Sequence, residues 1–166
     1  MKHRLDRFGG SLDPHAAFLL HRGMKTLAVR VKFQNESALN IARFLEGHAA
    51  VERVYYPGLA SDPQHARAAQ FFDGFGGVVS FELRGGVEEA KEFMRRTTLP
   101  ISAPSLGGVE TLITRPATTS HSGMSRQDRE RVGISDHLIR LSVGIEATED
   151  IVADFDRALE SILPIG

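Results

Sequence analysis

LIRLSVGIEATEDIVADFDRALESI, residues 138–162, is the segment that decides the predicted fold. Apolar and polar side chains alternate over residues 139–143, which is the period of a strand that buries one face. After Thr148, which we expect to cap a helix, apolar side chains return at helical spacing over residues 149–162. They form one stripe, which consists of Ile151, Phe155, Ala158 and Leu159. A strand followed by an amphipathic helix predicts a sheet that a layer of helices covers.

The same two patterns alternate upstream of this segment. β-rich stretches bounded by glycine or proline predict strands, and amphipathic stretches predict helices. The strands are expected at residues 51–56, 76–83 and 109–114, and the helices at residues 65–72, 87–97 and 125–133. The sequence therefore predicts an α/β (α+β) fold, with a sheet of about four strands that helices cover on one face.

The first 50 residues predict helices. Asp13 is placed to cap a helix, and Pro14 stands at its first position. Residues 27–33 alternate as a strand would, but helical spacing continues beyond them. We therefore expect a long helix over residues 25–45, ended by Gly47, in front of the sheet.

Composition restricts the class of protein. The chain has 166 residues, of which 42% are hydrophobic and 25% charged, and this suits one soluble domain. The net charge of -1 gives no basic surplus for binding nucleic acid. The sequence has no cysteine, and no apolar run of about 18 residues that could span a membrane. Because no apolar stretch follows the basic residues 1–8, we expect no signal peptide and a cytoplasmic protein.

Few residues suggest chemistry on their own. The 7 histidines are scattered without metal-ligand spacing, so we expect no metal site. The pair Gly107-Gly108 is too short for a nucleotide-binding loop. Ser120 precedes His121, but side chains adjacent in sequence rarely hydrogen-bond as nucleophile and base, so a hydrolase is disfavoured.

Arg140 is unusual inside an apolar strand, because burying a guanidinium without a partner is costly. Either Arg140 faces solvent on the open side of the sheet, or it awaits a carboxylate, which arginine binds with two parallel hydrogen bonds. Ser105 precedes Gly107-Gly108 by two positions. It is either a turn residue or a donor beside the same carboxylate, since glycine lets backbone approach a ligand. The residues alone leave both alternatives open.

Several motifs occur in one order along the chain. They are GGSLDP at 9–14, RGMKTL at 22–27, SLGGVETL at 105–112, PATTSH at 116–121, GIS at 133–135 and LIRLSVGIE at 138–146. With these motifs, residues 9–162 resemble the Cys/Met-metabolism (transsulfuration) family of pyridoxal-phosphate (PLP) enzymes. That family includes cystathionine γ-synthase, cystathionine γ-lyase, methionine γ-lyase and the homoserine-ester sulfhydrylases.

The resemblance implies a fold and a site. The fold is the small C-terminal domain of a fold-type I PLP enzyme, with residues 1–13 as a remnant of the large PLP domain and residues 14–166 as the domain that binds the substrate carboxylate. By position, Arg140 matches the arginine that binds the substrate α-carboxylate. Ser105 matches the serine beside that carboxylate, and Ser120 matches a polar position near the site.

The chain departs from the family at the lysine. The PLP lysine of the family lies upstream of the GGSLDP segment in a Ser-x-Thr-Lys setting, which Lys2, Lys25, Lys32 and Lys91 do not have. We therefore assign no catalytic residue and expect this chain to bind no PLP, although the resemblance implies PLP for the full-length enzyme. A second departure is Pro104, where members that handle cystathionine commonly carry Glu and plant-type γ-synthases resemble this chain.

The resemblance implies β- or γ-elimination or replacement on sulfur amino acids or homoserine esters. We interpret the chain as a truncated product, a proteolytic fragment or the product of a degenerate gene. The expected partners are a substrate carboxylate, the N-terminal PLP domain of the same enzyme and a second copy in a homo-oligomer, with no nucleic acid and no membrane. The alternative is a standalone, non-catalytic binding or dimerisation module that has lost PLP chemistry. A β-α fold without any ligand is the third possibility.

Overall fold

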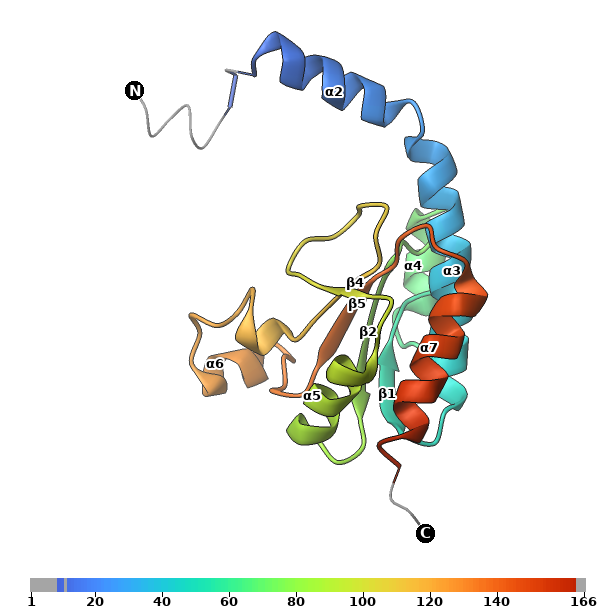
Figure 1. The fold of residues 1–166 in the computed structure, drawn as a ribbon, viewed down its shortest axis with the longest axis vertical. Coiled ribbons are helices and arrows are strands. Elements are labelled where there is room, and N and C mark those ends of the chain that lie inside the picture. Colours follow the sequence, from blue (N-terminus) through green and yellow to red (C-terminus); the bar gives the residue numbers. More distant parts are fainter. Residues whose placement is uncertain (1–8, 11, 164–166) are drawn as a thin grey trace.

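A computed structural model describes residues 9–10 and 12–163 of the chain (Figure 1). The helices alternate with short strands after two helices at the start. In chain order the elements are α2 (Pro14–Met24), α3 (Leu27–Gly47), β1 (Val51–Tyr55), α4 (His65–Phe71), β2 (Val78–Leu83), α5 (Val87–Arg96), β3 (Ile101–Ser102), β4 (Leu112–Thr114), the 3-10 helix η1 (Pro116–Thr118), α6 (Arg126–Arg131), β5 (Ile139–Ser142) and α7 (Thr148–Glu160). The α/β fold predicted from the sequence is confirmed.

The strands form one mixed sheet in the order β1-β2-β5-β4-β3. Strand β5 is the last in sequence but lies in the centre, antiparallel to both β2 and β4, whereas β3 and β4 are parallel. Leu141 of β5 lies opposite Val79 on one side and Ile113 on the other. All three side chains are buried, so a single register joins the two halves of the sheet through its apolar residues.

Helices α3, α5 and α7 cover one face of the sheet (Figure 1). The side chain of Phe93 in α5 packs edge-on against Phe81 of β2, with ring centroids 5.7 Å apart, and against Phe155 of α7 at 5.3 Å. All three rings are fully buried. Edge-to-face aromatic pairs add to the free energy of burial, so this trio fixes both helices on the sheet.

Three details differ from the sequence prediction. The sheet has five strands, because β3 was missed; it is only two residues long, and both are exposed. Strand β4 begins at Leu112 and not at residue 109. Thr148 does not cap α7, because Ala147 stands at the cap position and the Thr148 hydroxyl donates to Ser37 Oγ at 3.0 Å.

The two N-terminal helices form as predicted. The Asp13 side chain accepts the backbone N–H groups of His15 (2.9 Å) and Ala16 (3.1 Å), with Pro14 in the first turn. Helix α3 continues through Leu45 to Gly47, so the strand alternative at residues 27–33 is wrong. The predicted domain boundary falls directly before α2. Residues 1–8 and 11 lie outside the described residues, and the division of the chain at this point stays a prediction.

Helix α2 projects away from the sheet and buries none of its residues (Figure 1). The first two turns of α3 also expose apolar side chains. We call these side chains the N-terminal apolar surface: Leu12, Phe18, Leu19, Leu20, Met24, Leu27, Val29, Val31 and Phe33. Within the described residues, no helix is both long enough and apolar enough to cross a bilayer.

Candidate functional site

Arg140 lies in the middle of β5, on the sheet face opposite the helices. Its Cα partners are Ser80 of β2 and Thr114 of β4, and its neighbours Ile139 and Leu141 are fully buried in the core. Because successive strand residues point to opposite faces, the register that buries those neighbours places Arg140 on the other face. We call this face the polar face, and it carries Ser80, Glu82, Thr114, Arg140 and Ser142.

The guanidinium of Arg140 binds two backbone carbonyls. Its Nη2 donates to the oxygens of Pro104 (2.6 Å) and Ser105 (2.9 Å). Its Nε is buried and has no hydrogen-bond partner among the described residues. A buried donor without an acceptor is costly, more so on a charged group, so Arg140 carries an unused donor beside Ser105. The structure thus brings together two predicted site residues that are 35 positions apart, while their role with a carboxylate stays a prediction.

Residues 104–110, called here the 104–110 loop, cross the end of the sheet. The Ser142 hydroxyl accepts the N–H of Gly107 at 3.0 Å, and Gln34 Nε2 of α3 donates to the carbonyl of Gly108 at 2.7 Å. Gly107 has a φ of 75°, a conformation that favours glycine. Side chains from two separate elements therefore hold the middle and the end of the loop.

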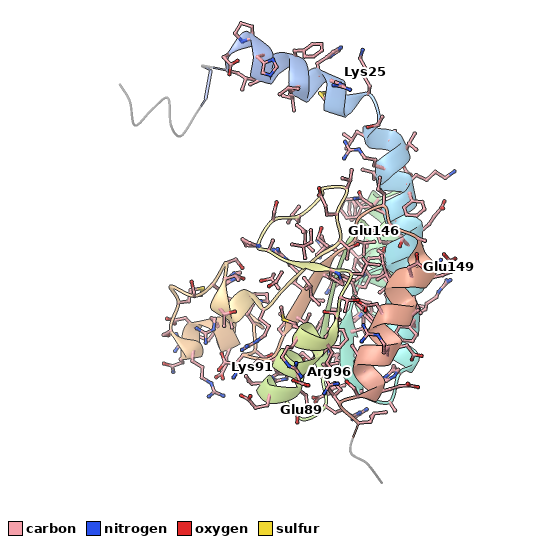
Figure 2. The ribbon with its side chains drawn as sticks, in the orientation of Figure 1. Lys25, Glu89, Lys91, Arg96, Glu146 and Glu149 are labelled. Atoms are coloured by element: carbon pink, nitrogen blue, oxygen red, sulfur yellow. The ribbon has the colours of Figure 1, made fainter. Side chains whose placement is uncertain are left out.

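The loop leaves the site beside Gly144. A Cβ at Gly144 would lie 2.3 Å from the carbonyl oxygen of Val109 and 2.6 Å from the backbone carbon of Glu110. Directly beyond, the Glu146 carboxylate accepts the N–H and the hydroxyl of Thr111, each at 2.7 Å (Figure 2 labels Glu146). These contacts explain why β4 starts late, because Val109 and Thr111 before it hydrogen-bond to the 144–146 segment.

Ser120 lies in the exposed turn after η1. Its Oγ hydrogen-bonds to Nδ1 of His121 at 2.9 Å, so the expectation that these adjacent side chains do not pair is wrong. No hydrogen bond joins Ser120 to Arg140 within the described residues. The link between them is indirect, because Thr119 Oγ1 lies 3.0 Å from Oγ1 of Thr114, the strand partner of Arg140. The structure places Ser120 near the polar face but not in contact with the guanidinium.

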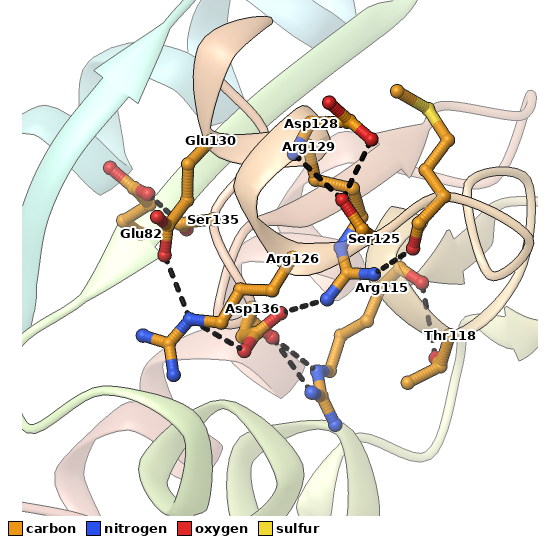
Figure 3. A network of polar contacts seen from close by, with 11 residues as sticks. Glu82, Arg115, Thr118, Ser125, Arg126, Asp128, Arg129, Glu130, Ser135 and Asp136 are labelled. Carbon is orange, nitrogen blue, oxygen red and sulfur yellow. Dashed lines mark hydrogen bonds and ion pairs between the residues drawn. The ribbon is translucent and has the colours of Figure 1, made fainter.

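Sequence reasoning missed a network of ionic contacts that holds the 115–137 segment (Figure 3). The Asp136 carboxylate accepts Arg129 Nη2 at 2.5 Å, and the Asp136 carbonyl accepts Nε and Nη2 of Arg115 at 3.1 and 2.7 Å. The hydrogen bond from Arg129 is the largest cause that lowers the pKa of Asp136. The charged run RQDRER at 126–131 was the available signal, but a run of this kind usually marks a solvated helix face.

A second cluster on the polar face surrounds Glu82. Its carboxylate accepts the hydroxyls of Tyr55 at 2.7 Å and of Ser135, and its Oε1 lies 3.5 Å from Nε2 of His137. Burial and then the hydrogen bond to Glu82 raise the pKa of Tyr55. The cluster ties Ser135 and His137 of the 115–137 segment to strands β1 and β2.

The described residues do not by themselves fit PLP. Lys25 ends α2 far from the sheet, and Lys91 lies on α5, where it pairs with Glu88 at 2.6 Å (Figure 2). Lys32 lines a hollow with Asn35 on α3. Among the described residues, no hydrogen bond joins any of these three lysines to Arg140. Nor do three His, Asp or Glu side chains gather as metal ligands in the part of the chain that the structure describes.

Comparison with known proteins gives consistent results. The chain is 47% identical over 154 residues to cystathionine gamma-synthase 1 (chloroplastic) of Arabidopsis thaliana, covering 93% of this chain and 27% of the plant protein. It is 44% identical over 157 residues to L-methionine gamma-lyase of Fusobacterium nucleatum subsp. polymorphum, covering 95% of this chain and 40% of that enzyme. The chain therefore spans well under half the length of these relatives.

A solved structure and a family model extend the match. The crystal structure of cystathionine gamma synthase from Xanthomonas oryzae pv. oryzae in complex with cystathionine superposes with a TM-score of 0.86 at 46% identity. The match covers 89% of this chain and 38% of that one. The model of the family described as "Cys/Met metabolism PLP-dependent enzyme" matches residues 1–160. The chain therefore belongs to the Cys/Met-metabolism family of PLP-dependent enzymes.

Proposed function

We propose that this chain forms the substrate-carboxylate part of a PLP-dependent transsulfuration enzyme. The reaction is a β- or γ-elimination or replacement on a sulfur amino acid or a homoserine ester. The observation that carries the proposal is the geometry of Arg140, whose guanidinium lies on the polar face, contacts the Ser105 carbonyl and keeps a buried Nε donor without a partner. The family supplies the chemistry that such a clamp would serve.

The role of Arg140 is to bind and orient a substrate. A carboxylate that accepts two parallel N–H bonds from one guanidinium is fixed in both position and plane. Fixing the carboxylate sets which bond of the α-carbon is aligned for reaction. Ser105 borders the same space, and its hydroxyl or backbone N–H provides a further donor. The electron sink in this family is PLP, and the lysine that holds it comes from a segment other than the described residues.

The partner of this chain is a domain that carries the PLP lysine. The N-terminal apolar surface supports this proposal, because α2 buries none of its residues and an apolar patch of this kind marks a protein interface. Without that domain the chain self-associates through this surface, which sedimentation velocity over a concentration series would show. A strictly monomeric profile at every concentration would contradict the proposal. The cytoplasmic location expected from the sequence stays a prediction.

The second candidate is a standalone binding or dimerisation module without PLP chemistry. The contacts of Arg140 favour it, because Arg140 binds the Pro104 and Ser105 carbonyls and no hydrogen bond joins it to a lysine among the described residues. The two candidates differ in one measurement. When this chain is co-expressed with the PLP-lysine domain of a relative, an enzyme part restores activity and the absorbance of a PLP Schiff base, whereas a standalone module restores neither.

The experiment for the carboxylate role uses that co-expressed or fused enzyme. Arg140→Lys keeps the charge but loses the fork, so KM for a homoserine ester or for L-methionine should rise. Arg67→Lys, the same change at an exposed arginine of α4, is the matched control and should leave KM unchanged. If Arg140→Lys also leaves KM unchanged, the carboxylate role of Arg140 is wrong.

A further inference from the structure

Gln34 is a buried polar side chain in the middle of α3. It is 6% exposed, and its Nε2 donates to the Gly108 carbonyl, which lies 74 positions later in the chain. Most buried side chains of α3 pack in the apolar core, so a buried amide there needs its own explanation. Within the described residues, the Gln34 side chain makes one hydrogen bond, and it reaches the 104–110 loop.

The surroundings of Gln34 fix where its amide can reach. A Cβ added at Gly77 would lie 3.1 Å from the Cβ of Gln34, so α3 approaches the end of β2 closely at this point. The carbonyl of Gly77 in turn accepts the N–H of Val143, directly after β5. The stem of Gln34 thus rests on the rigid end of the sheet, and its amide extends from there to the loop.

Residues 104–108 of the loop depend on side chains for their position. They make no backbone–backbone hydrogen bond within the described part of the chain, and only beyond them does the Val109 carbonyl accept the N–H of Ile145. Three side chains hold residues 104–108: Arg140 at their start, Ser142 at Gly107 and Gln34 at Gly108. Arg140 and Ser142 both lie on β5, whereas Gln34 comes from a helix on the other side of the core. Gln34 is therefore the anchor that fixes the loop relative to the helices.

We propose that Gln34 is a positioning residue, which sets the place of the 104–110 loop against Arg140. The proposal rests on the proposed function of Arg140 and Ser105 in holding a carboxylate. A neutral amide suits this task, because it binds a carbonyl without adding a charge that would compete for the substrate. Without the contact at Gly108, the loop pivots about Gly107 and the Ser105 carbonyl leaves Arg140.

The test uses the full chain and two variants. Gln34→Met keeps the length of the side chain without the donor, and Gln34→Asn keeps the amide but shortens its reach by one methylene. Amide hydrogen exchange of Gly107, whose N–H donates to Ser142 Oγ, should accelerate by about three- to tenfold in both, which matches the net value of one hydrogen bond. The NMR signal of Arg140 Nε–H, identified by its loss in Arg140→Lys, should shift or broaden. Gln70→Met, at an exposed glutamine of α4, is the control.

The two readouts separate positioning from general stability. If Gln34→Met accelerates exchange equally in β2, β5 and the loop while the Arg140 signal stays in place, Gln34 only stabilises the fold and the proposal is overturned. Unchanged loop exchange would overturn it as well. Neither readout needs catalysis, so they decide the role of Gln34 even if Arg140→Lys leaves KM unchanged in the assembled enzyme and the carboxylate role fails.

Discussion

The two faces of the sheet come from alternate residues of the same strands, yet they differ in what surrounds them. On the helix face, Val79, Phe81 and Leu141 are completely buried among apolar side chains. On the polar face, Ser80 and Arg140 stand beside them in sequence, and loops cover them in place of helices. The difference shows that a two-residue period can separate apolar packing from polar contacts within one strand, because each face meets a different partner.

The largest expected effect tests the helix face. Phe93→Ala removes the ring that contacts both Phe81 and Phe155, and it should lower the free energy of unfolding by about 3–5 kcal/mol. Urea denaturation of the full chain measures this loss. Phe72→Ala, at a ring that is 63% exposed, is the control and should cost less than about 0.5 kcal/mol. Equal losses in the two variants would show that the helix face is not the main source of stability.

The next prediction tests the polar face. Arg140→Ala should lower kcat/KM of the assembled enzyme. The decrease should correspond to an increase of about 2–5 kcal/mol in activation free energy, as when one partner of a buried charged pair is lost. Its cost in unfolding free energy should be smaller, about 1–2 kcal/mol, because only the bonds to two loop carbonyls disappear. If Arg140→Ala lowers the free energy of unfolding by as much as it raises the activation free energy, the polar face does not differ from the helix face in its role.

Asp154 is an acidic side chain buried within the helix layer, and it sharpens the comparison. Burial raises its pKa, but hydrogen bonds from Leu99, Thr98 and Arg157 outweigh that effect and hold the pKa below its ordinary value. The stabilisation is therefore complete above the pKa of the unfolded chain, about 4, and is lost as the pH falls through the lower pKa of the folded state.

Asp154→Asn should lower the free energy of unfolding by about 1.5–3 kcal/mol at neutral pH, the range for hydrogen bonds to a charged group. The difference from the unmodified chain should shrink as the solution is acidified below pH 4. Denaturation at several pH values measures it, and Asp156→Asn, two residues further along α7 and half-exposed, is the control. A difference that does not change with pH would mean that the charge of Asp154 is not the cause.

The smallest expected effect concerns Ser105. Its contact with Arg140 uses the backbone carbonyl, which alanine retains. Ser105→Ala should therefore leave unfolding unchanged and cost about 0.5–1.5 kcal/mol in kcat/KM, the value of one ordinary hydrogen bond to substrate. Ser102→Ala, in the exposed strand β3, serves as the control. If neither Ser105→Ala nor Ser102→Ala changes kcat/KM, the hydroxyl of Ser105 does not contact the substrate.

Most of the helices and strands can be predicted from the sequence, because hydrophobic periodicity and helix-capping residues are local signals. The alternation around Arg140 predicted its strand, and the Asp13-Pro14 pair predicted the start of α2. Motif order indicated the family. By contrast, the bonds from Arg140 to the loop and from Gln34 to Gly108 join residues 35 or more positions apart. They follow from strand register and helix placement, which no local pattern encodes. Strand β3 was missed because it has only two residues, both exposed, and so shows no alternation of apolar and polar side chains.

The central place of β5 has a consequence for how the chain acquires its fold. Strands β1 and β2 form an antiparallel pair and β3 and β4 form a parallel pair, and within the described residues neither pair hydrogen-bonds to the other. During synthesis both pairs emerge before residues 139–142, so each exposes an unpaired strand edge until the last strand inserts between them. Such long-range closure is slow and leaves edges open to aggregation. A stop codon shortly before Ile139 would thus remove both β5 and α7 and leave two half-sheets that no strand joins.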